Sequence, residues 1–368
     1  MLENFRRAML FWWGLAIAFT LVVWSLYWPR TETTSIATAP LPALGAVIDA
    51  TSVSGISSGA YMAGQFEMAH AKLVTGAAII AGGPYGCSES VFAEQMPGPG
   101  TAFLNLGKAI NGCMLDLLSV WGVGDPQKLA DKAKQRAARG EIDPIADVVT
   151  DRVYLFSGKE DRTVVPTIVK RAAEFYRRLG VPDANIALVD SISAGHAFVT
   201  ENEGGACSRS GEPYVVDCDY DQAGALLKHI YGALQPPANQ PSGNYIEFDQ
   251  SAYRKEASTD GLAKTGIVYV PTQCRQNSGC RIHIAYHGCA QNRQAVGDRF
   301  IKGSGFARWA DTNKLIILFP EVATTVSNPQ GCWDWWGYTG NDYLTREAPQ
   351  IVAVRSMLDA VKGGGPNS

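Results

Sequence analysis

The sequence has few histidines and little net charge, and each of these limits the kinds of partner or catalytic site that the protein can have. It contains five histidines in 368 residues, and its formal net charge at pH 7 is only −3. The charges form no long run of one sign, which argues against nucleic acid or acidic lipid as the main partner. No two cysteines have C-x-x-C spacing, which disfavours a zinc ribbon and a thioredoxin-like centre. We therefore expect a neutral or weakly charged substrate.

The N-terminus carries a long apolar run. Residues 8–28 lack any charge, and their 21 residues would form about 30 Å of helix, enough to cross a bilayer. Arg6 and Arg7 precede the run, so the N-terminus is expected inside and the rest of the chain outside. We predict a signal anchor over residues 1–28; the alternative is a signal peptide cleaved at 37–39. Either way the body is exported, as a periplasmic membrane-anchored or an extracellular protein.

Eight cysteines lie beyond this segment. An even number of cysteines in an exported protein indicates disulfide bonds. Closeness in sequence favours two pairs, Cys207–Cys218 and Cys274–Cys280, and leaves the other four cysteines open. Each bond would stabilise the fold by about 2–4 kcal/mol, mainly by restricting the unfolded chain.

The remainder of the chain is predicted to be one catalytic domain. Residues 29–45 are rich in Thr, Ala and Pro and are predicted to be a linker, and residues 46–362 form the domain. Strands and helices alternate along it, which indicates a mostly parallel α/β sheet with helices on both faces. The predicted strands are 46–53, 74–83, 152–158, 185–190, 265–270, 281–286 and 315–320. The predicted helices are 61–69, 125–140, 167–179, 221–231 and 348–361, and residues 84–124 are expected to be mostly loop.

One short motif has a chemical meaning of its own. Residues 55–59, Gly-Ile-Ser-Ser-Gly, fit the G-x-S-x-G pattern between a predicted strand and a predicted helix. This is the context of a nucleophile elbow, in which a sharp turn exposes a serine hydroxyl at the edge of the sheet. Bulky side chains at the two glycines would collide with neighbouring backbone. Ser57 is therefore the candidate nucleophile.

A serine nucleophile needs a histidine base. His196 follows a predicted strand in a glycine-containing loop, the place where parallel sheets carry their chemistry. The other histidines have a different context: two lie on predicted helices, one lies inside a strand and one belongs to a separate motif (His70, His229, His283 and His287). His196 is therefore the candidate base.

The base needs a carboxylate to orient it. Asp161 follows a strand and a Ser-Gly turn, and the order Ser57, Asp161, His196 is that of an α/β-hydrolase triad. Asp190 and Glu160 are the competing carboxylates, and an N-cap or a solvated turn is the competing role for Asp161.

The oxyanion hole needs two backbone N–H groups. One is expected from Ser58, directly after the nucleophile, and the other from Cys289 in the His-Gly-Cys loop at 287–289. In an ordinary α/β-hydrolase this H-G loop precedes the nucleophile, but here it follows Ser57 by 230 residues. The order indicates a circularly permuted α/β-hydrolase whose old termini are bridged near residues 235–243.

Five motifs resemble those of the single-domain, fungal-type poly(3-hydroxybutyrate) depolymerases and, more broadly, of the esterases that include feruloyl esterases. They are SGISSGAYMA at 54–63, AGGPYGC at 81–87, CDYD at 218–221, HGC at 287–289 and GCWDWWG at 331–337. The resemblance covers residues 40–362. It implies a circularly permuted α/β-hydrolase fold, with the triad Ser57, Asp161 and His196 and the oxyanion donors Ser58 and Cys289. It also implies four disulfides: Cys87–Cys113, Cys207–Cys218, Cys274–Cys280 and Cys289–Cys332.

The last of these disulfides would tie an aromatic cluster to the oxyanion loop. Its rings could line a cleft for an uncharged, methyl-bearing polyester chain, and we expect at least two of the four to belong to the core. The cluster consists of Trp333, Trp335, Trp336 and Tyr338.

Together these features predict an exported serine esterase that hydrolyses poly(3-hydroxybutyrate) or its oligomers through an acyl-enzyme, without a metal or organic cofactor. An N-terminal anchor and the lack of a separate polymer-binding domain favour soluble oligomers or another ester. We expect a monomer with no nucleic-acid partner, in contact with the membrane through its N-terminal segment. Two alternatives remain: a feruloyl- or acetyl-xylan-type carboxylesterase, and a non-catalytic envelope protein that binds a polymer.

Overall fold

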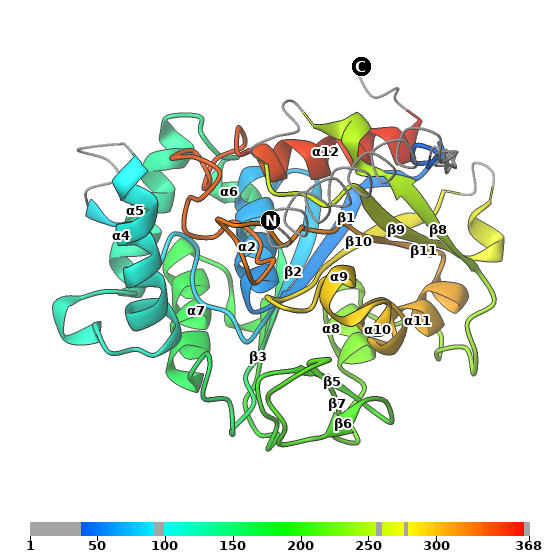
Figure 1. Cartoon of the computed structure of the whole chain (residues 1–368), viewed down its shortest axis with the longest axis horizontal. Coiled ribbons are helices and arrows are strands. Elements are labelled where there is room, and N and C mark those ends of the chain that lie inside the picture. The colour runs from blue at the N-terminus through cyan, green and yellow to red at the C-terminus, as the bar shows by residue number, and fades with distance from the viewer. Residues whose placement is uncertain (1–37, 92–98, 255–259, 276–278, 364–368) are drawn as a thin grey trace, which may run out of the picture. The chain divides into compact units, whose positions relative to one another are not determined.

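The computed structural model describes residues 38–91, 99–254, 260–275 and 279–363 (Figure 1). They belong to one compact unit that starts at Thr38. The predicted signal anchor at residues 1–28 lies outside the described residues. Among the residues that are described, no helix has both the length and the apolar character needed to span a bilayer.

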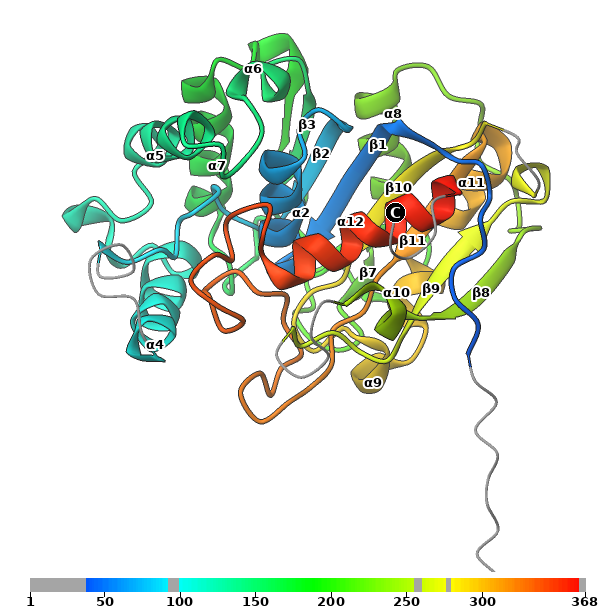
Figure 2. The same cartoon turned by 90° about the horizontal axis from the view of Figure 1, so that it is seen from above.

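The main sheet has eight strands within the described residues, in the order β4-β3-β2-β1-β10-β11-β9-β8 (Figures 1 and 2). The strands from β4 to β11 are parallel, and β9 pairs antiparallel with both β11 and β8. The predicted mostly parallel sheet is therefore confirmed. The strands are β1 Val47–Ile56, β2 Val74–Ile80, β3 Arg152–Phe156, β4 Ile186–Val189, β8 Asn244–Asp249, β9 Thr265–Val270, β10 Arg281–Tyr286 and β11 Leu315–Phe319.

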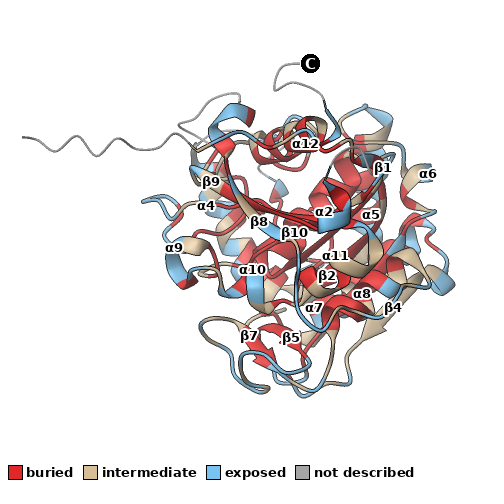
Figure 3. Ribbon diagram, turned by 90° about the vertical axis from the view of Figure 1, so that its right-hand side faces the viewer, coloured by how far each residue is buried: buried red, intermediate tan, exposed pale blue. Residues whose placement is uncertain are grey.

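Helices cover both faces of this sheet (Figure 3). One face packs against α2 (Ser58–Ala69), α7 (Pro166–Leu179) and α12 (Pro349–Lys362), and the other against α8 (Gln222–Tyr231), α10 (Arg299–Gly303) and α11 (Phe306–Asn313). Shorter or peripheral helices are α4 (Pro99–Lys108), α5 (Pro126–Ala138), α6 (Ile145–Val148) and α9 (Arg293–Val296). A small second sheet joins β5 (Phe198–Thr200), β7 (Val215–Asp217) and β6 (Gly205–Ala206).

The two helical layers create two hydrophobic cores. Successive side chains of a strand point to opposite faces, so β3 sends Val153 and Leu155 into one core and Tyr154 and Phe156 into the other. All four side chains are buried. A strand covered on both faces needs a continuous apolar run, which explains why these strands could be predicted without any alternation of polar and apolar residues.

The two ends of the predicted domain meet where the permutation predicts. The amide of Leu44, just before β1, donates to the carbonyl of Val361 near the end of α12 at 2.9 Å. Counted from β8 instead of β1, the strands lie in the order 1-2-4-3-5-6-7-8. The H-G loop then follows the third strand and the elbow follows the fifth, which is the arrangement of an α/β-hydrolase.

Residues 38–45, at the end of the predicted linker, are packed against the domain. Leu41 and Leu44 are buried, and the amide of Leu41 donates to the hydroxyl of Tyr253 at 2.8 Å. The predicted bridge near 235–243 connects α8 to β8 and runs along α11, where the amide of Ala238 donates to the carbonyl of Arg308 at 2.9 Å.

The expected loop over residues 84–124 is partly helical. It contains α4, a π-helical segment at Ala109–Met114 and a 3₁₀ turn at Ser119–Trp121. Its glycines and prolines have low helix propensity, which is why the sequence favoured a loop. Tertiary contacts hold the segment instead: the Cys87–Cys113 disulfide and a 2.5 Å hydrogen bond from the Tyr61 hydroxyl to the Cys113 carbonyl.

Candidate active site

Ser57 lies at a strained turn between β1 and α2. Its φ of 57° is in the left-handed region, which residues other than glycine rarely occupy, and its amide donates to the carbonyl of Ile80 at 2.9 Å. It occupies the N-cap position of α2, yet its hydroxyl makes no capping bond. The hydroxyl is therefore not used to stabilise the helix.

The glycines on either side of Ser57 allow close backbone packing. A Cβ atom on Gly55 would come within 2.0 Å of the Gly59 carbonyl oxygen. A Cβ atom on Gly59 would come within 2.3 Å of the His287 carbonyl oxygen. The second contact places the start of α2 directly against the loop that follows β10.

His196 and Asp161 form a buried pair. His196 Nδ1 lies 2.8 Å from Asp161 Oδ2, and the other carboxylate oxygen accepts the amides of Thr163 and Val164 at 2.8 and 2.9 Å. A carboxylate that holds Nδ1–H leaves Nε2 as the basic nitrogen of the imidazole. The pair thus has the geometry required of a base and its orienting carboxylate.

The loops that carry this pair are bonded to each other. The amide of Glu160 donates to the carbonyl of Ala194 at 3.0 Å, and a Cβ on Gly158 would meet that same carbonyl oxygen at 2.2 Å. The competing carboxylates lie elsewhere: Asp190 forms a 3.1 Å ion pair with Lys170, and the side chain of Glu160 is exposed.

Ser57, Asp161 and His196 follow the carboxyl ends of β1, β3 and β4, so all three belong to one edge of the parallel sheet. Among the described residues, the hydrogen bonds of His196 go to Asp161 and Ser210, and none goes to Ser57. The structure thus joins base and carboxylate directly and places the serine at the same edge. Catalytic hydrogen bonds to the nucleophile are often formed only when substrate is bound.

The two expected oxyanion donors are unpaired amides. Neither the Ser58 amide nor the Cys289 amide donates to a protein group within the described part of the chain. A Cβ atom on Gly288 would lie 3.3 Å from Ser57 Cβ, which puts the H-G loop beside the candidate nucleophile. Two unsatisfied N–H groups next to a nucleophile are what a developing oxyanion requires.

Two side chains that the sequence did not single out for this purpose hold the H-G loop. His287 Nδ1 lies 2.7 Å from the Gly288 carbonyl oxygen, and the Val322 amide donates to His287 Nε2 at 3.3 Å. Gln291 Oε1 accepts the Gly288 amide at 2.8 Å. The Gly288 carbonyl and the Cys289 N–H belong to one planar peptide, so holding the carbonyl also aims the N–H. The sequence contained no signal for Gln291.

The aromatic cluster is mostly buried. Trp333 is fully buried, and its ring packs edge-on against Tyr286 with a centroid separation of 4.8 Å. Trp335 stacks on Tyr61 at 4.1 Å, and Trp336 is also buried. Tyr338 is partly exposed and contacts Trp336 at 4.9 Å. Trp333 therefore has no surface free for a ligand, in line with the expectation that part of the cluster is core.

Asp334 shapes the loop that carries these rings. Its two carboxylate oxygens accept backbone amides from Trp336, Gly337, Tyr338 and Thr339, with distances between 2.7 and 3.3 Å. Burial raises its pKa, and these bonds act in the opposite direction.

The eight cysteines form the four disulfides that the family resemblance implies: Cys87–Cys113, Cys207–Cys218, Cys274–Cys280 and Cys289–Cys332. The last one links the H-G loop to the aromatic loop. Among the described residues, no group of three His, Cys, Asp or Glu side chains is arranged to hold a metal ion.

Two curated proteins are similar to most of this chain. A poly(3-hydroxybutyrate) depolymerase of Delftia acidovorans is 39% identical over 329 residues, which cover 88% of this chain and 62% of that protein. A polyhydroxybutyrate depolymerase of Talaromyces funiculosus is 32% identical over 349 residues, which cover 89% of this chain and 94% of that protein. The chain thus spans about three fifths of the first relative and nearly all of the second. No family model matches the sequence.

Two solved structures share the fold. The crystal structure of PHB depolymerase from Penicillium funiculosum superposes with a TM-score of 0.76 at 31% identity, covering 89% of this chain and all of that one. A serine-to-alanine variant of a PHB depolymerase, complexed with an R3HB trimer, superposes with the same score, identity and coverage.

Proposed function

The chain belongs to the poly(3-hydroxybutyrate) depolymerase family of serine ester hydrolases, and from this we propose that it hydrolyses poly(3-hydroxybutyrate) or its oligomers through an acyl-enzyme. The names of the relatives suggest the substrate class, and the geometry of the candidate site suggests which residues act in the reaction.

In the proposed mechanism, His196 Nε2 takes the proton of the Ser57 hydroxyl as its oxygen attacks the ester carbonyl. The amides of Ser58 and Cys289 stabilise the negative charge that develops on the carbonyl oxygen. His196 then gives its proton to the departing alcohol oxygen, which leaves an acyl-enzyme on Ser57. Water, deprotonated by His196, cleaves this ester, releases the acid and restores Ser57.

One observation carries this proposal. The buried His196–Asp161 pair, with Nδ1 and Oδ2 2.8 Å apart, lies at the same sheet edge as a serine held at a φ of 57°. A purely structural histidine would not need a fully buried carboxylate on Nδ1 while Nε2 bonds to none of the described residues. The hydroxyl of Ser57 does not cap α2, so it is free to give its proton to that base.

The substitution Ser57→Ala tests the mechanism. It removes the nucleophile, and hydrolysis of soluble hydroxybutyrate oligomers should fall on the order of 10⁵-fold or more, with the melting temperature retained. Ser356→Ala is the matched control, because the Ser356 hydroxyl on α12 donates to the carbonyl of Val352 within the same helix; this variant should keep full activity. Residual turnover of Ser57→Ala close to that of the parent chain would overturn the assignment.

A substrate panel separates the ester classes. We expect hydroxybutyrate oligomers to be hydrolysed with a higher kcat/KM than feruloyl or acetyl-xylan esters, because the similar proteins named above carry depolymerase names. A preference for feruloyl esters would favour the carboxylesterase alternative. Absence of any turnover, together with no labelling of Ser57 by an organophosphonate, would favour a binding protein.

We also propose that the protein is exported and held at the membrane by residues 1–28. Four disulfides are typical of proteins that fold in an oxidising compartment, and the uncharged run at 8–28 has the length of a membrane anchor. Cells producing the full chain should retain it in a membrane fraction that detergent extracts and salt does not. Recovery in the cytosol with reduced thiols would contradict export.

A further inference from the structure

A groove with three cationic side chains lies beside the loop that holds His196. Its volume is about 560 Å³, and its cations are Arg209, Arg299 and Lys302. We call it the cationic groove. Pockets of this size accommodate small organic ligands. The groove is formed by the 207–218 loop, which the Cys207–Cys218 disulfide closes, together with α10 and the turn before β6.

The positive charge of the groove is largely uncompensated. Arg209 and Arg299 form no ion pair and no side-chain hydrogen bond with any described residue, whereas Lys302 forms a 2.9 Å ion pair with Asp298. Glu203 is the one carboxylate among the described residues that line the groove. Converging cations with few partners create a positive potential that attracts an anion.

The floor between these cations is apolar and closely packed. Val215 is 3% exposed, and a Cβ on Gly303 would lie 3.6 Å from its Cγ1 atom. Arg209 lies along the backbone of Gly205, where an added Cβ would be 3.4 Å from Arg209 Cδ. An apolar floor under an arginine suits a ligand that carries both a short aliphatic chain and a carboxylate.

The wall of the groove contacts the candidate active site at two points. The His196 amide donates to the hydroxyl of Ser210, the neighbour of Arg209, at 2.7 Å. On the other side, Gln291 Nε2 donates to the carbonyl of Tyr214 at 3.1 Å, while Gln291 Oε1 holds the amide of Gly288. The 207–218 loop thus supports both the base and the oxyanion loop.

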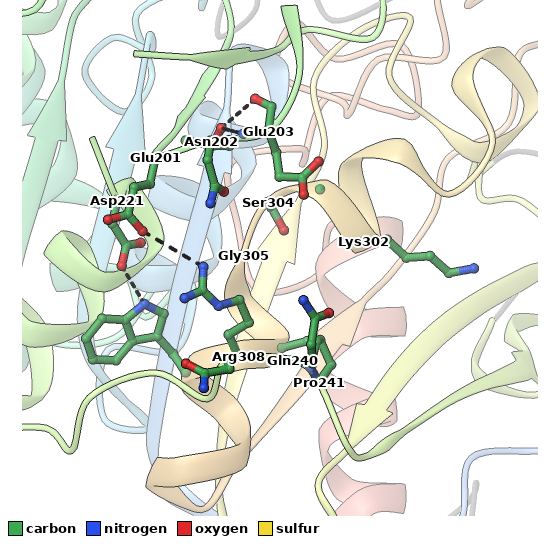
Figure 4. A pocket seen from close by; sticks show the side chains of 15 residues that line it. Glu201, Asn202, Glu203, Asp221, Gln240, Pro241, Lys302, Ser304, Gly305 and Arg308 are labelled. Carbon is green, nitrogen blue, oxygen red and sulfur yellow. Dashed lines mark hydrogen bonds and ion pairs between the residues drawn. The ribbon is translucent and has the colours of Figure 1, made fainter. Parts of the chain in front are cut away.

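A neighbouring hollow offers a contrast, because polar side chains in it bond to one another (Figure 4). There, Trp309 Nε1 donates to Asp221 at 2.8 Å, and Arg308 lies 3.9 Å from Glu201. Lys302 extends away from these pairs in Figure 4. In that hollow Arg308 has a carboxylate partner and Asp221 accepts an indole N–H, whereas Arg209 and Arg299 of the cationic groove form no ion pair with any described residue.

We propose that the cationic groove binds the terminal carboxylate of linear hydroxyalkanoate oligomers while an ester bond of the same chain reaches Ser57. This inference rests on the proposed function and adds a substrate class to it: free-acid oligomers, the products of earlier ester cleavage. Each cleavage of a polyester leaves one fragment ending in a carboxylate, so such chains accumulate as hydrolysis proceeds. The same groove could instead receive the released hydroxy acid, which has the same chemistry, and the experiment below separates the two.

The test compares a hydroxybutyrate trimer with a free carboxyl group and its methyl ester. The full chain should hydrolyse the free acid with a lower KM, and this advantage should shrink at high salt. Arg209→Gln and Arg299→Gln should each raise KM for the free acid about three- to tenfold, with kcat/KM for the methyl ester unchanged. Glu203→Gln removes the opposing charge and should lower KM for the free acid.

Arg152→Gln is the matched control, because Arg152 is exposed at the opposite edge of the sheet, where β3 begins, and it should change neither substrate. Equal effects of the groove variants on both trimers, or no effect on either, would overturn the proposal. The proposal would also be overturned if the free acid had no KM advantage while 3-hydroxybutyrate inhibited methyl-ester hydrolysis and Arg209→Gln abolished that inhibition. That result would mean that the groove binds the released hydroxy acid. Failure of the proposed function has a different outcome, since neither trimer would then be hydrolysed.

Discussion

The protonation state of one imidazole, that of His287, decides which groups beside the H-G loop it can bond. The Gly288 carbonyl can only accept, so the proton must be on His287 Nδ1, and the Val322 amide requires an unprotonated Nε2. Burial lowers the pKa of His287 to about 4, which keeps the ring neutral at ordinary pH. His287 is therefore a positioning residue in our interpretation and not a second base.

Replacing His287 should lower turnover without weakening substrate binding. In His287→Phe the Gly288 peptide loses its anchor, and kcat should fall about 10- to 100-fold with KM nearly unchanged, somewhat less than the loss of a complete oxyanion donor. His287→Asn retains an N–H donor near the Nδ1 position and should recover part of the activity. Steady-state kinetics on a soluble oligomer checks this.

His229→Phe is the control, because His229 lies in the last turn of α8, where its ring bonds to the carbonyl of Asn185. A fall in kcat of equal size for this variant, or an inactive His287→Asn as unstable as His287→Phe, would point to a general folding defect.

A buried carboxyl pair makes the stability of the domain depend on pH. Glu67 on α2 and Asp151 before β3 are both buried, and the hydroxyl of Tyr176 donates to Glu67. Burial raises the pKa of Glu67 to about 7 and raises that of Asp151 as well. The folded protein therefore retains protons that the unfolded chain releases, and the free energy of unfolding should fall as pH rises from about 4.5 through about 7.

The substitution Glu67→Gln removes the titrating group and keeps an acceptor for Tyr176. Its free energy of unfolding should decline less than that of the parent chain between about pH 5 and about pH 8, by on the order of 2 kcal/mol. Urea denaturation at several pH values measures this. Glu174→Gln, a change at a half-buried glutamate on α7 that pairs with Arg178, should leave the slope between these pH values unaltered. Parallel pH profiles for Glu67→Gln and the parent chain would refute the argument.

At the scale of elements, two disulfides of similar chemistry should have different consequences. Cys289–Cys332 closes 43 residues and connects the H-G loop to the aromatic loop, whereas Cys274–Cys280 closes six residues between β9 and β10. Loop-closure entropy predicts a loss of about 4 kcal/mol when the first pair is replaced by serines and of about 2 kcal/mol for the second.

Only the first replacement should also affect catalysis, because in the proposed mechanism the amide of Cys289 in the H-G loop stabilises the oxyanion. We expect a marked fall in kcat for the Cys289→Ser, Cys332→Ser variant at a temperature where it is still folded. The Cys274→Ser, Cys280→Ser variant should retain the parent kcat. Thermal denaturation and steady-state kinetics on the same preparations distinguish the two, and equal kcat values would contradict the role of the link.

At the scale of the whole molecule, the hydrogen bond between Leu44 and Val361 places the two ends of the domain side by side, so its segments could be joined there and opened elsewhere. We predict that joining Gly363 to Ala43 with a short glycine-serine linker and opening new ends within residues 236–241 gives a folded, active protein. Such a variant loses the buried Leu41, which should cost about 2–3 kcal/mol of stability. Opening the chain within the 207–218 loop instead should abolish activity, since that loop holds His196 and Gln291. Equal activity of both variants would disprove this.

The sequence by itself determined the features that depend on local sterics and on chain order. The elbow could be predicted because a serine with a left-handed backbone conformation needs small residues on either side. Gly55 and Gly59 supply them, and both can be recognised in the sequence. The doubly covered strands could be predicted from continuous apolar runs. The permutation could be predicted from the order of the elbow and the H-G loop alone, because order requires no knowledge of contacts.

The tertiary structure alone decided which side chains serve the site from a distance. Gln291 links Gly288 to Tyr214, 77 residues away, and no local pattern marks such a contact. Burial separates Trp333 from Tyr338 although both belong to one short aromatic stretch. The cationic groove likewise exists only because Arg209 and Arg299, 90 residues apart, are brought to one surface. Such roles arise from packing between segments far apart in the chain, and the free energy of that packing is not contained in any single segment.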